Sequence, residues 1–224
     1  MYTELWHGSV NIIEKPIYGH GNSFNDYGQG FYCTEDIELA KEWAATDITD
    51  GYANHYIFDM PDAKLLNLSD VQYTILNWLA LLVDNRKFAV SSSVGKLGKD
   101  YLKENFLIDI SAYDVIKGYR ADDSYFTFAK AFLNNTISLN QLSKAMKLGN
   151  LGEQIVIKSE KAFKHIHFLD YEAENSLIYF TKKKERDTAA RKSYQKQLAE
   201  EDLEGIFMRD ILREKIRNDD PRLF

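Results

Sequence analysis

Two short segments near the amino terminus carry side chains that could hold a small molecule. In the first, residues 5–9, His7 ends an expected strand and precedes Gly8, whose bare backbone a flat ligand could approach closely. In the second, residues 26–34, glycines precede the adjacent aromatic residues Phe31 and Tyr32, which would point to opposite faces of a strand and could stack on a ring. Taken alone, each segment also has a structural explanation, as a capped strand end and as core aromatics.

A third segment, residues 152–157, places Glu153 and Gln154 directly before an apolar run. A carboxylate there can be a solvated strand end. Inside a cleft it could instead bind a sugar hydroxyl and offset positive charge at an anomeric carbon. Because side chains alternate along a strand, only one of these two neighbours can face such a cleft. The sequence leaves open which one.

A charged cluster formed by Arg120, Asp122 and Asp123 is the densest one before the tail. It could hold a substrate group, bind a cation, or cap a helix that starts near Ser124.

Two other reactive groups are interpreted as structural. His165 and His167 share one face of an expected strand, but no third ligand lies nearby, so we expect no metal. Cys33 has no partnered histidine in its sequence context, and we expect a buried thiol.

Composition narrows the class of protein. The 224 residues are 45% hydrophobic and 13% aromatic with three prolines, which excludes a disordered chain and fits one domain with a helical appendage. No apolar stretch is long enough to cross a bilayer, and the start of the chain lacks a secretory pattern. With a single cysteine, this favours a cytoplasmic protein without a membrane partner. The net charge of -6 argues against broad nucleic-acid binding.

The elements that must position these groups are short strands with helices inserted between them. We expect strands at 5–7, 31–34, 55–59, 64–68, 154–157 and 162–169. We expect helices capped by Thr34, over 70–83, around 124–133 and 138–146, and in a charged amphipathic tail from Lys182. The pattern predicts an α+β fold with mixed or antiparallel sheets, made of a domain over 1–181 with a helical insertion near 70–150, and a tail over 182–224.

The order histidine, tyrosine, glutamate, each at or near a short strand, resembles the ADP-ribosyltransferase superfamily. The likeness is to its diphtheria-toxin-like and poly(ADP-ribose)-polymerase-like branch, which carries a His-Tyr-Glu triad. The matching segments are 6–9, 30–34 and 153–157, and Trp43 stands where that branch usually has a second tyrosine. More closely, segments 26–45, 113–116, 121–123 and 154–156 resemble an uncharacterised bacterial family assigned to that superfamily, and the likeness covers roughly residues 1–180.

This resemblance implies a split mixed β core and transfer of ADP-ribose from NAD to an unidentified macromolecular acceptor, with release of nicotinamide. Hydrolysis of NAD is the nearest variant. NAD would be the substrate and no metal would be required. The acceptor would be a protein rather than a nucleic acid, and a toxin-like role with a paired antitoxin is a family-level expectation.

Roles for individual residues also follow from the resemblance. His7 would bind a ribose hydroxyl, the Gly8 backbone would bind the nicotinamide carboxamide, and Tyr32 and Trp43 would enclose the nicotinamide ring. Glu153 would bind the ribose 2′-hydroxyl and stabilise the oxocarbenium ion, acting with His7 and Tyr32 as the catalytic set. Residues expected to contact the dinucleotide are His7, Gly8, Ser9, Phe31, Tyr32, Trp43 and Gln154. The alternative is an inactive nucleotide- or protein-binding module, in which Glu153 faces away from His7 and Tyr32.

Overall fold

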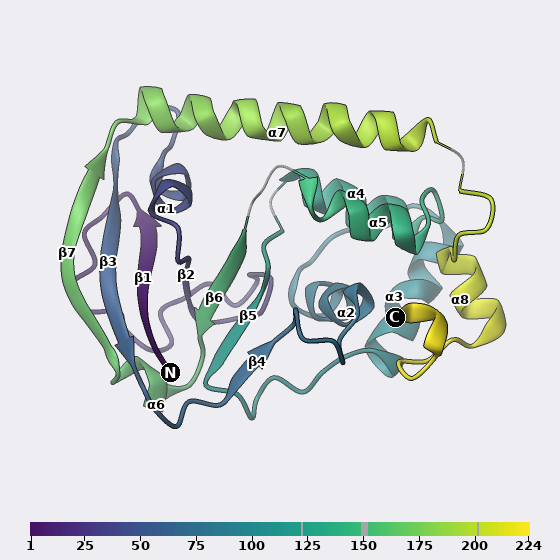
Figure 1. Ribbon diagram of the computed structural model, residues 1–224, viewed down its shortest axis with the longest axis horizontal. Helices are drawn as coiled ribbons and strands as arrows, with labels where there is room; N and C mark the ends of the chain where they lie inside the picture. The colour runs from purple at the N-terminus through teal and green to yellow at the C-terminus, as the bar shows by residue number, and fades with distance from the viewer. Residues whose placement is uncertain (122, 149–151, 201) are drawn as a thin grey trace.

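The computed structural model describes residues 1–121, 123–148, 152–200 and 202–224, and confirms a mixed α+β fold (Figure 1). Within these residues the strands form two sheets. The first is antiparallel, in the order β1 (Tyr2–Ser9), β3 (Gly51–Asp59), β7 (Ile166–Glu174). The second has the order β2 (Phe31–Cys33), β6 (Glu153–Ile157), β5 (Val115–Tyr119), β4 (Leu65–Asn67), with only the β4–β5 pair parallel.

The two sheets meet where β1 passes β2. An isolated bridge joins Trp6 to Thr34 there, with N···O distances of 2.7 and 2.9 Å in the two directions. Beyond this bridge β1 continues through His7 and Gly8 in unbroken pairing with β3. The expected strands at 5–7 and 31–34 are therefore present and adjacent.

Helix α1 (Ile37–Ala44) packs on β1 and β3. Its N-cap is Asp36 rather than the expected Thr34, because the Asp36 carboxylate accepts hydrogen bonds from the N–H groups of Glu38 and Leu39. The Thr34 hydroxyl instead accepts from the Asp36 N–H. The helix lies so close to β1 that a Cβ at Gly8 would stand 2.0 Å from the Ala40 carbonyl oxygen and 2.7 Å from the Ala44 nitrogen.

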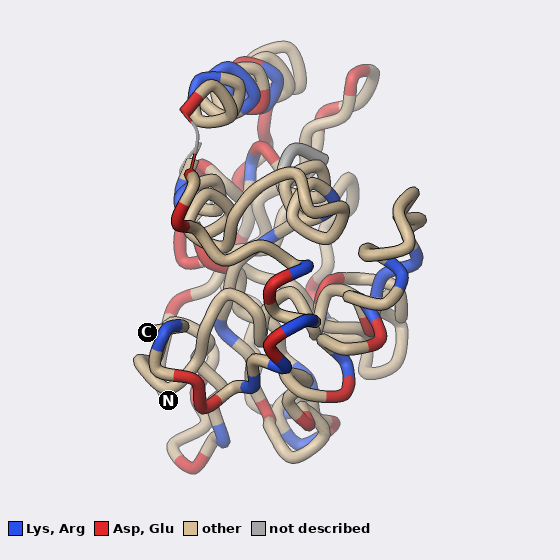
Figure 2. Tube along the Cα trace, turned by 90° about the vertical axis from the view of Figure 1, so that its right-hand side faces the viewer, with Lys and Arg blue, Asp and Glu red and all other residues tan. Residues whose placement is uncertain are grey.

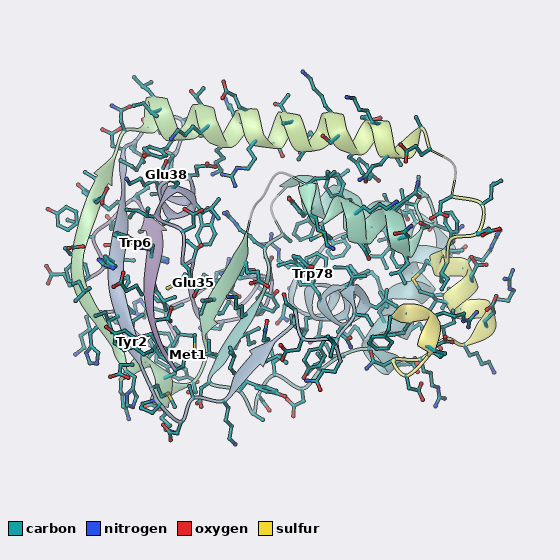
Figure 3. All side chains as sticks on the ribbon, viewed as in Figure 1. Met1, Tyr2, Trp6, Glu35, Glu38 and Trp78 are labelled. Atoms are coloured by element: carbon teal, nitrogen blue, oxygen red, sulfur yellow. The ribbon has the colours of Figure 1, made fainter. Side chains whose placement is uncertain are left out.

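A helical half of the molecule packs against the second sheet around the buried Trp78 (Figure 3). Its helices are α2 (Ile75–Asn85), α3 (Ser93–Asn105), α4 (Asp123–Leu133) and α5 (Leu139–Ala145). The sequence patterns did not predict α3, whose buried residues include Gly95 and Gly98, a residue type of low helix propensity. Gly98 leaves room for Met208, whose side chain would lie 2.8 Å from a Cβ at that position.

The last part of the chain differs from the single amphipathic helix expected from Lys182. Helix α7 (Ser176–Leu198) begins earlier and extends from β7 across to α4 and α5 (Figure 1). A shorter helix, α8 (Met208–Glu214), packs on α3, and a 3-10 turn (Pro221–Leu223) follows. Leu203, an apolar residue of the tail, lies between the two helices and is 87% exposed. No described helix is long and apolar enough to cross a membrane.

Two smaller features complete the arrangement. The expected strand at 162–169 starts later, at Ile166, because Ser159 caps a short helix α6 (Glu160–Phe163) before it. Basic and acidic residues are interspersed along the chain rather than gathered in one region (Figure 2).

The close packing of α1 on β1 makes a prediction about Gly8. Gly8→Ala should lower the free energy of unfolding by about 3 kcal/mol, because the new Cβ overlaps backbone atoms that cannot move aside independently. Chemical denaturation measures this. Gly19→Ala is the control: its Cβ would meet nothing within 4 Å, so only the positive φ of 83° opposes it, at about 1 kcal/mol. Equal losses for the two variants would contradict the prediction.

Candidate functional site

A cavity of about 270 Å³ opens where β1, β2, α1 and β6 come together. Five residues of the predicted dinucleotide-binding set border it: His7, Gly8, Tyr32, Trp43 and Gln154. These residues span nearly 150 positions of sequence, and the fold brings them to one place.

His7 is held with its ring neutral. Its Nδ1 lies 2.7 Å from the Tyr32 carbonyl oxygen, and since a carbonyl only accepts, Nδ1 carries the hydrogen and donates. The ring stacks on Phe31 with centroids 4.4 Å apart. Burial lowers the pKa of His7, although the Tyr32 carbonyl opposes this effect. In the neutral ring Nε2 is therefore an acceptor, suited to a hydroxyl donor.

Gly8 offers backbone atoms to the same cavity. Hydrogen-bonded and non-bonded pairs alternate along an antiparallel ladder, and Trp6 directs its backbone N–H and C=O away from β3, toward Thr34. Gly8 lies two residues later in an unbroken register, so its N–H and C=O point to the same side. A donor and an acceptor next to each other at one edge are the complement of a primary carboxamide.

Two aromatic rings border the cavity from different elements. The Tyr32 hydroxyl accepts from the Tyr27 N–H at 3.1 Å and donates to the Gly28 carbonyl at 2.5 Å, so the ring cannot turn freely. Burial raises the pKa of Tyr32 far above its ordinary value, so the hydroxyl is not an acid–base group at neutral pH. Trp43 comes from α1, and the Arg120 guanidinium lies over its indole ring, 4.3 Å from the centroid. A planar cation thus already occupies one face of this ring.

The register of β6 against β5 determines which of Glu153 and Gln154 faces the cavity. Gln154 lies opposite Gly118, is 3% exposed, and borders the cavity. Glu153 points to the other face, where its carboxylate hydrogen-bonds Ser69 and lies 3.3 Å from Lys117 Nζ. The structure therefore does not bring Glu153 together with His7 and Tyr32, and the third group at the cavity is an amide.

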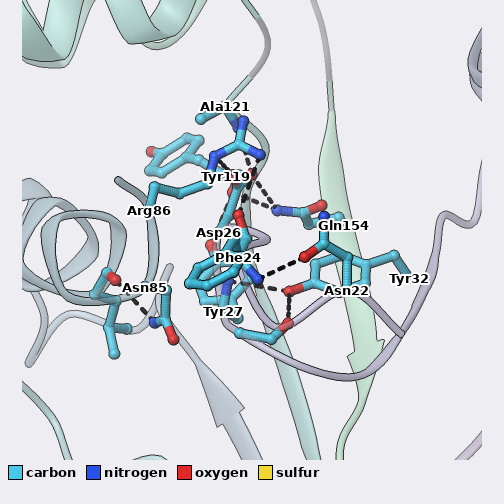
Figure 4. A network of polar contacts seen from close by, with 12 residues as sticks. Asn22, Phe24, Asp26, Tyr27, Tyr32, Asn85, Arg86, Tyr119, Ala121 and Gln154 are labelled. Atoms are coloured by element: carbon cyan, nitrogen blue, oxygen red, sulfur yellow. Dashed lines mark hydrogen bonds and ion pairs between the residues drawn. The ribbon is translucent and has the colours of Figure 1, made fainter. Parts of the chain in front are cut away.

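Sequence reasoning missed Asp26 and Arg86, which also border the cavity. The Asp26 side chain is buried, with 5% of the residue exposed, and its Oδ1 lies 3.3 Å from Arg86 Nε. Its Oδ2 accepts hydrogen bonds from the Ala121 N–H at 2.8 Å and from Gln154 Nε2 at 3.0 Å (Figure 4). Burial raises the pKa of Asp26, opposed by these donors. The partners lie 60 to 128 positions away in sequence, so no local motif marks them.

The other predicted site residues are divided. Arg120 borders this cavity, whereas Ser9 ends β1 and does not. Phe31 packs in the core against Tyr56 and also borders a second, neighbouring cavity. Asp123 begins α4, and Asp122 lies outside the described residues.

The histidine pair and the cysteine are also placed. His165 precedes β7 and its Nδ1 lies 2.9 Å from the Asp59 carbonyl, while His167 is exposed. Among the described residues no group of three or more His, Cys, Asp or Glu could hold a metal ion. Cys33 is fully buried, and burial raises the pKa of its thiol.

A second cavity of about 460 Å³ adjoins the first and shares His7, Asn25 and Tyr32 with it. Its other walls include the apolar side chains of Ile17 and Phe163 together with Lys15 and His20. The two cavities together could accept a long ligand with two unlike ends.

Fold and site thus define an α+β protein with a polar, aromatic-lined cavity where two small sheets meet. Residues 3–168 match the family model described as "Protein of unknown function (DUF3990)", and the chain belongs to this family. The match contains every residue named above as bordering the first cavity. Neither the curated proteins nor the solved structures include a match to the chain.

The buried, neutral His7 predicts a pH-dependent stability. The folded pKa lies below the unfolded value of about 6.5, so the unfolded state binds more protons as pH falls through that region. Stability should therefore fall between pH 7 and pH 5. In His7→Asn, whose amide can still donate to the Tyr32 carbonyl, the fall should be smaller. Urea denaturation at each pH measures both proteins, and parallel curves would contradict the assignment.

Proposed function

We propose that this protein binds NAD in the two adjoining cavities and transfers ADP-ribose to a macromolecular acceptor, releasing nicotinamide. The observation that carries this proposal is the convergence of His7, the Gly8 backbone, Tyr32, Trp43 and Gln154 on one cavity. That set offers a carboxamide clamp, ring platforms and acceptors for ribose hydroxyls.

The first cavity suits the nicotinamide end. The Gly8 N–H and C=O can pair with the carboxamide, and Tyr32 provides a fixed ring. The nicotinamide ring of NAD is planar and cationic, and the stacking of Arg120 on Trp43 indicates that this indole accepts a planar cation. Arg86 and Arg120 both border this cavity, and guanidinium groups bind phosphate oxygens well, which suits the pyrophosphate. The larger, more apolar second cavity would take the adenosine end.

The proposed reaction requires no covalent bond between the protein and the substrate. The bond from C1′ to the pyridinium nitrogen breaks, its electron pair leaves with neutral nicotinamide, and positive charge develops on the ribose. A nucleophile of the acceptor then bonds to C1′ and loses a proton. Orientation of the dinucleotide and stabilisation of this charge are the main requirements. His7 Nε2 and the Gln154 carbonyl oxygen are two acceptors at the cavity that could hold the ribose.

An inactive module that binds a nucleotide or a partner protein is the second candidate. It is favoured by the position of Glu153, whose carboxylate pairs with Lys117 on the opposite face of β6. In this case the cavity would bind NAD or a related nucleotide without cleaving it.

Three further expectations belong to the same proposal. The two sheets would correspond to the split mixed β core of ADP-ribosyltransferases, the protein would act in the cytoplasm, and the acceptor would be a protein. A paired antitoxin would then be the natural partner of such an activity.

Labelled NAD tests the proposal. Wild-type protein, incubated with a host lysate, should release nicotinamide and transfer label to macromolecules. Gln154→Ala should lower the rate of release about a hundredfold, because a group that contacts the developing charge is lost. Glu153→Ala should leave the rate within about twofold, since that carboxylate does not border the cavity. Chromatography of released nicotinamide gives both rates.

The controls separate the two candidate functions. Binding of NAD by calorimetry without any release would establish the inactive module. No binding of NAD would refute the transferase and the nucleotide-binding form of the module, and would leave only a module that binds a partner protein. Loss of release in Glu153→Ala with retention in Gln154→Ala would restore the triad assignment and overturn the role of Gln154.

A further inference from the structure

The amide of Gln154 has a fixed orientation, which its neighbours determine. Nε2 lies 3.0 Å from Asp26 Oδ2 and 3.1 Å from the Tyr119 carbonyl oxygen. The Tyr119 carbonyl can only accept a hydrogen bond, so the amide nitrogen must face it and the amide oxygen must face the other way. Gln154 borders the cavity, so Oε1 is the atom that it offers to a ligand.

Asp26 can play this part only as a carboxylate. Among the described residues, the groups that hydrogen-bond or pair with its two oxygens are the Arg86 guanidinium, the Ala121 N–H and the Gln154 amide, and all three are donors (Figure 4). A proton on Asp26 would have no acceptor among these partners. The negative charge therefore lies directly behind the amide, across a charge-assisted hydrogen bond.

We propose that Asp26 and Gln154 act as one unit: the buried carboxylate supplies negative charge, and the amide presents it through Oε1 to a ribose hydroxyl of the bound dinucleotide. The identity of the ligand rests on the function proposed above. Asp26 is a positioning residue here, because it acts through Gln154. The pair would bind the ribose hydroxyl and stabilise positive charge, the role that the triad pattern assigned to Glu153, although the carboxylate does not contact the ligand directly.

The pair also explains why position 154 holds an amide. A glutamate there would place a second carboxylate about as close to Asp26 as Nε2 is now, and would also face the Tyr119 carbonyl. Two carboxylates at this distance cannot both be ionised at low cost. Gln154→Glu should therefore be unfavourable while Asp26 is present and less so after Asp26→Asn.

Three variants test the proposal beside the wild type: Asp26→Asn, Gln154→Glu and the double variant. Steady-state release of nicotinamide from NAD gives kcat and KM for each. Asp26→Asn should lower kcat about a hundredfold, because Arg86 then adds uncompensated positive charge where positive charge develops. Its KM should change less than threefold, since the clamp, the rings and the phosphate contacts remain. A merely structural role would raise KM as well.

The double variant carries the negative charge on residue 154 itself, and its kcat should be at least tenfold higher than that of Asp26→Asn. A kcat unchanged in Asp26→Asn, or a double variant no faster than Asp26→Asn, would overturn the proposal.

A stability measurement without NAD tests the pairing of Asp26 and Gln154 independently of the proposed transferase activity. Urea unfolding of the four proteins should show coupling: Gln154→Glu lowers the denaturation midpoint, and adding Asp26→Asn recovers part of it instead of lowering it further. Additive effects would overturn the pairing of the two residues. If the wild type releases no nicotinamide yet the coupling is present, the proposed function fails while the oriented pair stands. If both are absent, both fail.

Discussion

The buried carboxylate of Asp26 is the interaction on which the cavity depends. It lies in the loop between β1 and β2 and reaches three other parts of the chain: Arg86 after α2, Ala121 after β5 and Gln154 on β6. A charge at 5% exposure is tolerated only when donors surround it, and here the donors come from three segments that are far apart in the sequence. One group thus joins the strand half of the molecule to the helical half at the cavity wall.

Other polar groups of the cavity are also immobilised by bonds that face away from the ligand. His7 uses Nδ1 on the Tyr32 carbonyl, the Tyr32 hydroxyl bonds to the loop at Tyr27 and Gly28, and Gln154 uses its nitrogen on Asp26 and Tyr119. What each side chain leaves for a ligand is one acceptor or one ring face. Groups fixed in this way need little reorganisation when charge develops beside them, which is the property that transfer of a sugar from a cationic leaving group requires.

Local patterns predicted much of the strand framework, and they predicted His7, Tyr32 and Gln154 as candidates, because glycine-flanked aromatics and short apolar runs are visible within a few residues. They could not decide between Glu153 and Gln154: alternation relates the two neighbours, but only the pairing with β5 says which faces inward. Asp26 and Arg86 were missed for a related reason, since each is unremarkable locally and acquires its role from distant partners. Helix α3 was missed because two of its buried residues are glycines, which disfavour a helix locally, and the contact of Gly98 with Met208 cannot be seen in the sequence.

The tail beyond the family match also bears on the cavity, through α1. Tyr179 and Lys182 of α7 hydrogen-bond the Glu38 carboxylate, and Arg186 pairs with Glu42 where both side chains are mostly buried. Glu38 and Glu42 lie one turn apart on α1, the helix that also carries Trp43. Helix α1 packs against Gly8 of β1 without room for a Cβ. The contacts with α7 therefore add a second set of interactions that hold the same helix. Helix α7 therefore contacts the helix that carries Trp43, although no described residue of α7 borders the cavity itself.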